Sequence, residues 1–113
     1  MLGKVGLTAA ALLMAAGAAL ADDIVGNWKT NSGETAAITG GGPFSITLQT
    51  GKYTGKRIGT LDAAGGGKYT GDITDPATDK TYSGKATLSG DSLKMSGCVL
   101  GGLICKNQDW QRM

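Results

Sequence analysis

The chain has 113 residues, with eleven basic and nine acidic side chains, two cysteines, twenty glycines and no histidine. A net charge of +2 gives no indication of a nucleic-acid surface or of a cationic membrane patch. Without histidine, Ser-His-Asp and Cys-His catalysis are excluded, and two lone sulfur atoms make a zinc site improbable. We therefore expect no metal and no other cofactor.

The first twenty-one residues are typical of a secretory signal peptide. Lys4 provides the positive start, Leu7 to Leu20 form an apolar run too short to span a bilayer, and Ala19-Leu20-Ala21 fits a small-x-small cleavage site. We expect residues 22–113 to form a single exported domain, periplasmic or secreted, without a membrane span. An uncleaved membrane anchor is the alternative.

Short runs of alternating apolar and polar residues predict strands, and no run shows helical periodicity. The expected strands are Ile24 to Thr30, Thr35 to Thr39, Phe44 to Thr50, Tyr53 to Leu61, Lys68 to Thr74, Lys80 to Leu88, Ser92 to Val99 and Leu103 to Gln111. Eight strands close a small barrel that is filled by side chains or holds one small ligand. The predicted fold class is all-β, an antiparallel barrel of about eight strands.

A short motif recurs along the chain. Gly51-Lys52-Tyr53-Thr54-Gly55 returns as Gly67-Lys68-Tyr69-Thr70-Gly71, with a looser echo in Lys80 to Gly84. The order of residues differs from that of a phosphate-binding loop, and no helix follows to supply a dipole. We interpret the repeat as strand sequence at the start of hairpins.

The two cysteines are predicted to form a disulfide across a hairpin. If Gly101 and Gly102 are the central residues of a two-residue turn, Cys98 faces Cys105 directly. Opposed strand residues lie about 4.5–5.5 Å apart, which a disulfide accepts. This phase of the ladder makes them a hydrogen-bonded pair, the wider of the two kinds. Export to an oxidising compartment favours the bond.

The last third of the chain resembles a family of small secreted bacterial proteins, the domain-of-unknown-function 2147 family. The residues that carry the resemblance are Gly71, Ile73, Asp75-Pro76, Lys80-Thr81-Tyr82, Leu88, Leu93-Lys94, Gly97-Cys98, Gly101-Gly102-Leu103, Cys105, Gln108 and Trp110. The resemblance implies a lipocalin-like β-barrel with no established biochemical role. Gly26-x-Trp28 is similar to the first-strand motif of lipocalins, in which the indole packs across the closed end of the barrel.

Strand alternation places a polar stripe inside the barrel. If Val99 and Ile104 face inward, Lys106, Gln108 and Trp110 face inward too. We hypothesise that Lys106 and Gln108 hold the polar head of a small apolar or amphipathic ligand. The aromatic residues expected to contact its apolar body are Trp28, Tyr82 and Trp110. On this hypothesis the protein binds a ligand and is not an enzyme.

Several alternatives remain open at this point. Lys106 or Arg112 could instead cover Trp28 by a cation–π contact, and a single bulge would turn Lys106 outward. A hydrolase that uses two carboxylates, for example near Asp75 and Asp79, is a further alternative. The second functional class is a ligand-free module that binds an envelope protein or inhibits an enzyme through its loops and outer face. The oligomeric state is left open.

Overall fold

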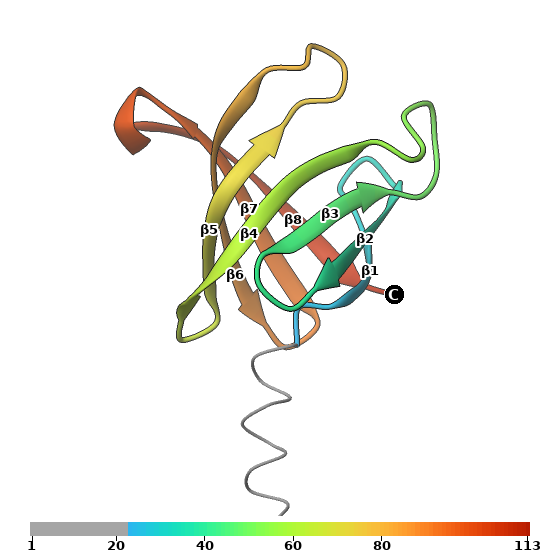
Figure 1. Cartoon of the computed structure of the whole chain (residues 1–113), viewed down its shortest axis with the longest axis horizontal. Helices are drawn as coiled ribbons and strands as arrows, with labels where there is room; N and C mark the ends of the chain where they lie inside the picture. Colours follow the sequence, from blue (N-terminus) through green and yellow to red (C-terminus); the bar gives the residue numbers. More distant parts are fainter. Residues whose placement is uncertain (1–22) are drawn as a thin grey trace, which may run out of the picture.

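The computed structural model describes residues 23–113, which form a closed antiparallel barrel in which each strand pairs with the next in sequence (Figure 1). The predicted signal peptide lies outside the described residues, and so does the predicted start of the domain at residue 22. The strands are β1 (Gly26–Lys29), β2 (Thr35–Gly40), β3 (Phe44–Leu48), β4 (Arg57–Gly65), β5 (Lys68–Thr74), β6 (Thr81–Ser89), β7 (Ser92–Val99) and β8 (Ile104–Arg112). The predicted fold class is confirmed.

The largest difference from the predicted strands lies before β4, which begins at Arg57 and not at Tyr53. The chain turns here: the Gly55 N–H donates to the Leu48 carbonyl and the Lys56 N–H donates to the Tyr53 carbonyl. Gly51 and Gly55 have φ angles of 87° and 88°, which only glycine adopts readily. The first copy of the repeated motif is therefore a loop, and its interpretation as strand is wrong, whereas most of the second copy lies in β5.

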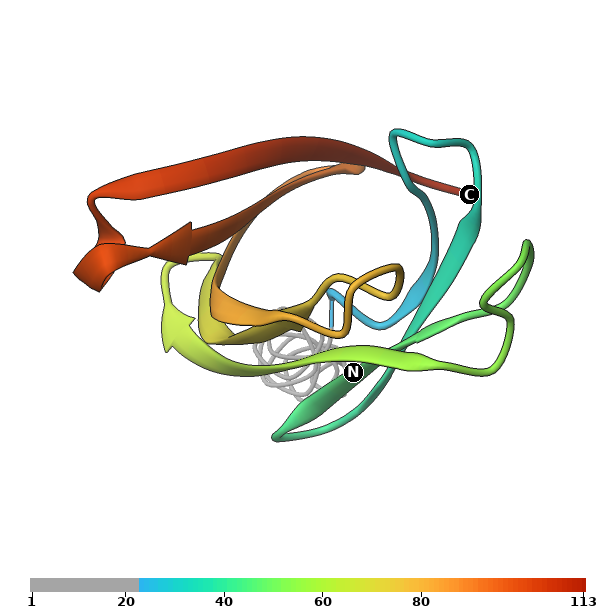
Figure 2. The ribbon, with the colours of Figure 1, turned by 90° about the horizontal axis from the view of Figure 1, so that it is seen from above.

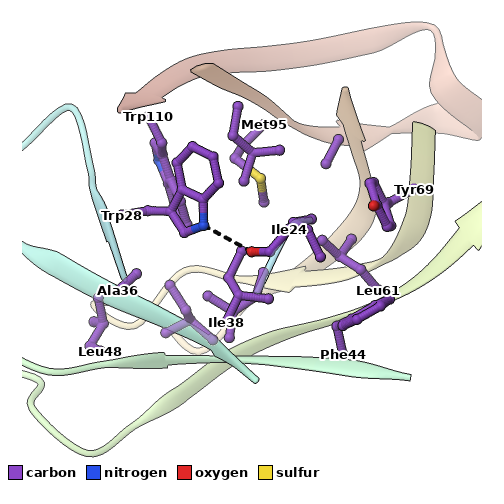
Figure 3. Close-up of a cluster of buried hydrophobic side chains, with 14 residues drawn as sticks. Ile24, Trp28, Ala36, Ile38, Phe44, Leu48, Leu61, Tyr69, Met95 and Trp110 are labelled. Carbon is purple, nitrogen blue, oxygen red and sulfur yellow. Dashed lines mark hydrogen bonds between the residues drawn. The ribbon is translucent and has the colours of Figure 1, made fainter. Parts of the chain in front are cut away.

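The two ends of the barrel differ in how they are covered. Residues 30–34, 49–56, 75–80 and 100–103 connect the strands at one end, which we call the open end (Figure 1). The chain enters at the opposite, closed end, where Ile24 lies among the strands and is fully buried (Figure 3). No helix in residues 23–113 is long and apolar enough to cross a membrane.

Most of the hydrophobic core lies in the closed half of the barrel (Figure 3), and its members Leu48 and Ile58 extend to the open end. It consists of inward side chains from every strand, because period-two alternation places one apolar face inside. Its large, fully buried members are Trp28, Phe44, Ile24, Ile38, Ile46, Leu61 and Leu93. The Trp28 indole N–H donates to the Ile24 carbonyl at 3.0 Å, so the buried indole has no unpaired polar atom.

Arg112 closes the junction between the first and last strands. The two strands share only the pairs Trp28↔Arg112 and Lys29↔Gln111. The Arg112 guanidinium lies 4.4 Å from the centre of the Trp28 ring. Its Nε donates to Asp91 Oδ1 at 3.1 Å, and another nitrogen donates to the Asp23 carbonyl at 2.6 Å. The expected cation–π cover of Trp28 is therefore supplied by Arg112 and not by Lys106.

The predicted disulfide is present between Cys98 and Cys105. The register of β7 and β8 runs without a shift from Ser92↔Gln111 to Val99↔Ile104, as the two-glycine turn predicts. The two Cα atoms are 4.1 Å apart, which matches the narrow, non-hydrogen-bonded kind of pair and contradicts the predicted wider kind. The Arg112 N–H donates to the Asp91 carbonyl, which makes these two residues a hydrogen-bonded pair. Hydrogen-bonded and non-hydrogen-bonded pairs alternate along the ladder from there, so Cys98 and Cys105 fall on a non-hydrogen-bonded pair.

Candidate functional site

The open half of the barrel contains a cavity of about 440 Å³. Its walls come from β4, β5, β6, β7, β8 and the β5–β6 loop. The lining residues are Ile58, Ile73, Thr74, Asp75, Pro76, Tyr82, Gly97, Val99, Ile104, Lys106 and Gln108. Most of these side chains are apolar, and the polar ones stand close to the mouth or on β8.

The cavity exists because the inward positions of two neighbouring strands are small. Gly84 and Gly97 oppose each other on β6 and β7, and the next inward pair towards the closed end is Ala86 opposite Met95. A Cβ atom on Gly84 would lie 2.6 Å from Cγ1 of Ile73, so this glycine makes room for the isoleucine that lines the cavity. A Cβ atom on Gly97 would lie 3.6 Å from its nearest neighbour, the Cβ of Tyr82, so this position borders open space. The core consequently ends below this level and leaves a hollow above it.

Lys106 and Gln108 line the cavity on β8, and both side chains are also exposed to solvent. No register shift interrupts β7 and β8, so the bulge that would turn Lys106 outward is absent from this pair. Within residues 23–113, the Lys106 ammonium has neither a hydrogen bond nor an ion pair. The Gln108 Oε1 accepts a hydrogen bond from the Trp110 indole at 3.0 Å, and its amide N–H₂ has no partner in the described part of the chain. The wall therefore presents unengaged donors.

The five predicted ligand residues fall into two groups. Tyr82, Lys106 and Gln108 line the same cavity. Trp28 and Trp110 lie instead in the core of the closed half, where they are 0% and 4% exposed (Figure 3). The core needs both indoles because Trp28 packs under Arg112 and Trp110 lies opposite Leu93. Trp110 still touches the site indirectly, through its hydrogen bond to Gln108.

Sequence reasoning missed the part of the cavity that the β5–β6 loop provides, including Asp75 and Pro76. The Asp75 carboxylate accepts a hydrogen bond from the Ala77 N–H at 2.9 Å, which is the turn expected of an Asp-Pro sequence. Asp79 forms an ion pair with Lys56 across the open end. Ile58 and Pro76 also line a smaller hollow of about 270 Å³, between this loop and residues 48–53.

The β7–β8 hairpin ends in an exposed apolar tip. The hairpin tip, Val99 to Ile104, carries four aliphatic side chains that are 38% (Val99), 68% (Leu100), 85% (Leu103) and 56% (Ile104) exposed. Leu100 has a φ of 54°, a left-handed conformation that costs a non-glycine residue roughly 1–2 kcal/mol. The Cys98–Cys105 disulfide lies directly below the tip.

Lys106 and Gln108 contribute hydrogen-bond donors to the lining of the cavity. Residues 23–113 contain no group of three or more potential metal ligands. The lysine ammonium and the glutamine amide match a carboxylate, phosphate or other acceptor-rich group, and the surrounding aliphatic walls match an apolar chain.

These features define a class of protein: a small up-and-down β-barrel with a packed closed end and a hollow open end. The chain belongs to the family described as uncharacterized proteins conserved in bacteria (DUF2147), whose profile matches residues 45–112, more than half of the sequence. The resemblance seen in the sequence is confirmed. No curated protein and no solved structure matches the chain.

Proposed function

We propose that the protein binds a small amphipathic molecule with an anionic head in the cavity of the open half, without transforming it. The observation that carries this proposal is the Lys106 ammonium, which stands on the wall of an apolar cavity and has no partner among residues 23–113. An exported barrel would hold such a molecule in the periplasm or outside the cell.

The polar head of the ligand interacts with Lys106 and with the free N–H₂ of Gln108. The Trp110 indole fixes the orientation of that amide, because its N–H donates to Gln108 Oε1 and so directs the donor groups of Gln108 elsewhere. This hydrogen bond gives the buried tryptophan a positioning role. A carboxylate would accept both contacts at once.

The apolar body of the ligand packs against Ile73, Tyr82, Val99 and Ile104. A volume of about 440 Å³ lies within the range of about 300–1,000 Å³ typical of small-molecule sites. The buried core below the level of Gly97 limits the depth, so we expect a short or medium-length chain rather than a long one.

Isothermal titration calorimetry of the purified domain with decanoate tests the proposal. Lys106→Ala should weaken binding by about tenfold, as expected for loss of a charge-assisted hydrogen bond at a partly solvated site. The matched control is Lys85→Ala on the outer face of β6, opposite Ser96, which should bind like the wild type. Decanol, which lacks the carboxylate, should bind weakly to the wild type and to Lys106→Ala alike.

Native mass spectrometry of protein taken directly from the periplasm of the producing cells identifies what the cavity holds. A reproducible adduct of a few hundred daltons that is lost in Lys106→Ala supports the proposal. A clean mass of the protein alone, together with no heat from decanoate, would reject it. The remaining function would then be a ligand-free module that binds an envelope protein or inhibits an enzyme.

A further inference from the structure

We propose that the hairpin tip, Val99 to Ile104, docks onto the surface of a phospholipid bilayer that contains anionic lipid. This site goes beyond the proposed function, because it lies on the outside of the hairpin and does not require an occupied cavity. Four properties of the hairpin favour docking: its exposed side chains, its projection, its charge and its continuity with the cavity.

The first property is an uninterrupted apolar surface. From Val99 to Ile104 the sequence is Val-Leu-Gly-Gly-Leu-Ile, without a polar side chain. Among residues 23–113, Leu103 and Leu100 are the most exposed large hydrophobic side chains, at 85% and 68%. Single exposed apolar residues are ordinary, whereas a contiguous group marks an interaction surface.

The second property is that the tip projects from the barrel as a braced unit. The last register pair between β6 and β7 is Ser83↔Cys98, so the residues beyond it have no neighbouring strand on that side. In the view from above, the hairpin extends past the rest of the barrel wall (Figure 2). The disulfide joins the two strands at the base of the tip, which reduces the conformational entropy lost when the tip is immobilised.

The third property is the charge of the hairpin. Lys106 is the charged residue of the hairpin nearest the tip, one residue beyond Cys105, whereas Lys94 lies far from the tip and faces Asp109 across the ladder. On the neighbouring β5–β6 loop, the Asp79 carboxylate is paired with Lys56 and Asp75 accepts the Ala77 N–H. The base of the tip thus approaches an anionic surface with the positive charge of Lys106, which adds to the attraction from apolar burial.

These properties fit a bilayer better than a protein partner. Protein interfaces are centred on aromatic residues and arginine, with a polar rim that provides hydrogen bonds, and each partner contributes about 800 Å². The tip has four aliphatic side chains, no aromatic ring and no side-chain donor. A convex aliphatic tip flanked by lysine needs no directional partner and inserts among lipid headgroups.

The fourth property links the tip to the cavity. Val99 and Ile104 belong to both, since they line the cavity and are also partly exposed on the tip. An amphiphile leaving the bilayer would pass along a continuous apolar surface from the tip to Lys106. Docking of the tip therefore places the mouth of the cavity beside the lipid.

Flotation with vesicles of phosphatidylcholine and phosphatidylglycerol tests the docking. Wild-type protein should float with mixed vesicles, and the Leu100→Ser/Leu103→Ser variant should lose about tenfold or more in partitioning, as two exposed leucines no longer enter the lipid. Met113→Ser is the matched control, because Met113 is 65% exposed at the other end of β8 and should leave partitioning unchanged. Thermal unfolding of the free proteins checks that each variant is folded.

A tryptophan at the most exposed position reports where the tip goes. In Leu103→Trp, vesicles should shift the emission to shorter wavelength, and brominated lipid should quench it. In the wild type, Trp28 and Trp110 are buried in the core and should respond little. Emission of the Leu103→Trp protein that is unchanged by vesicles would overturn the proposal.

The outcomes separate docking from ligand binding. Lys106→Ala should still float, with partitioning reduced by no more than about fivefold through loss of one charge, while it binds decanoate about tenfold more weakly. Leu100→Ser/Leu103→Ser should bind decanoate like the wild type while failing to float. Failure of the wild type to float, or flotation that the double serine variant retains, would overturn docking even if decanoate binds. Concentration-dependent dimerisation that the double serine variant abolishes, without flotation of the wild type, would assign the tip to a second copy and also overturn it.

Discussion

The closed and open halves of the barrel use the same strands for opposite purposes. Strand β8 makes the contrast clear, since it carries one cation in each half. Arg112 lies over the Trp28 ring and holds Asp91 and the Asp23 carbonyl, whereas Lys106 stands on the cavity wall without a partner among residues 23–113. A positive charge that is fully engaged supports the fold, and one that is left unengaged beside an apolar cavity is available to a ligand.

The same contrast holds for small and large inward residues. In the closed half, large side chains such as Trp28, Phe44 and Leu93 point inward and are fully buried. In the open half, two inward positions carry no side chain: Gly84 leaves room for Ile73, and Gly97 leaves space beside Tyr82. Stability is therefore expected to be concentrated at one end of the barrel and binding at the other.

The largest expected effect is that of Trp28→Ala in the closed half. Removing a fully buried indole should lower the free energy of unfolding by about 3–5 kcal/mol, since the surrounding strands cannot collapse onto the space. Denaturant titration followed by circular dichroism measures the loss. Tyr82→Ala in the open half, where the ring is only half-buried, should cost about 1 kcal/mol. Equal losses for the two variants would contradict the division into halves.

Removal of the disulfide should have an intermediate effect on the fold. The Cys98→Ser/Cys105→Ser variant should lose about 2.5 kcal/mol, because the bond closes a small ring of chain with a sequence separation of 7. Urea titration with and without reductant on the wild type provides an independent measure. Because most of the core lies in the other half, the reduced protein should keep its barrel; complete unfolding on reduction would show that the hairpin supports the closed half as well.

The two cations of β8 give the sharpest paired comparison. Arg112→Ala should lower the free energy of unfolding by about 2 kcal/mol, through loss of the cation–π contact and of hydrogen bonds to two backbone carbonyls. Lys106→Ala should change it by less than about 0.5 kcal/mol. Thermal and urea unfolding of both variants measures the two changes in the free energy of unfolding. A destabilised Lys106→Ala protein would mean that this lysine supports the fold.

Much of the fold could be predicted because the signals are local. Alternation along Ser92 to Val99 and the two glycines after Leu100 were enough to predict the hairpin, its register and the facing cysteines. The start of β4 could not be predicted in this way. Tyr53 continues an alternating pattern in the sequence, but Gly51 and Gly55 adopt positive φ angles and turn the chain before Arg57.

The candidate site was only partly predictable. The stripe of Lys106 and Gln108 followed from strand alternation, and both residues line the cavity with Tyr82. Two features could not be foreseen from spacing along one strand. The tryptophans were assigned to the ligand although the core takes both, and the β5–β6 loop with Pro76 was not connected with the site.

By itself the sequence determined the number of strands, their inward faces and the pairing of the two cysteines, because these depend on period-two alternation and on turns of a few residues. Only the tertiary structure decided which cation covers Trp28 and where the interior remains hollow. Both depend on side chains from strands that are distant in sequence and meet only when the barrel closes. Arg112 reaches Trp28 across the junction of β8 and β1, and Gly84 meets Gly97 across β6 and β7.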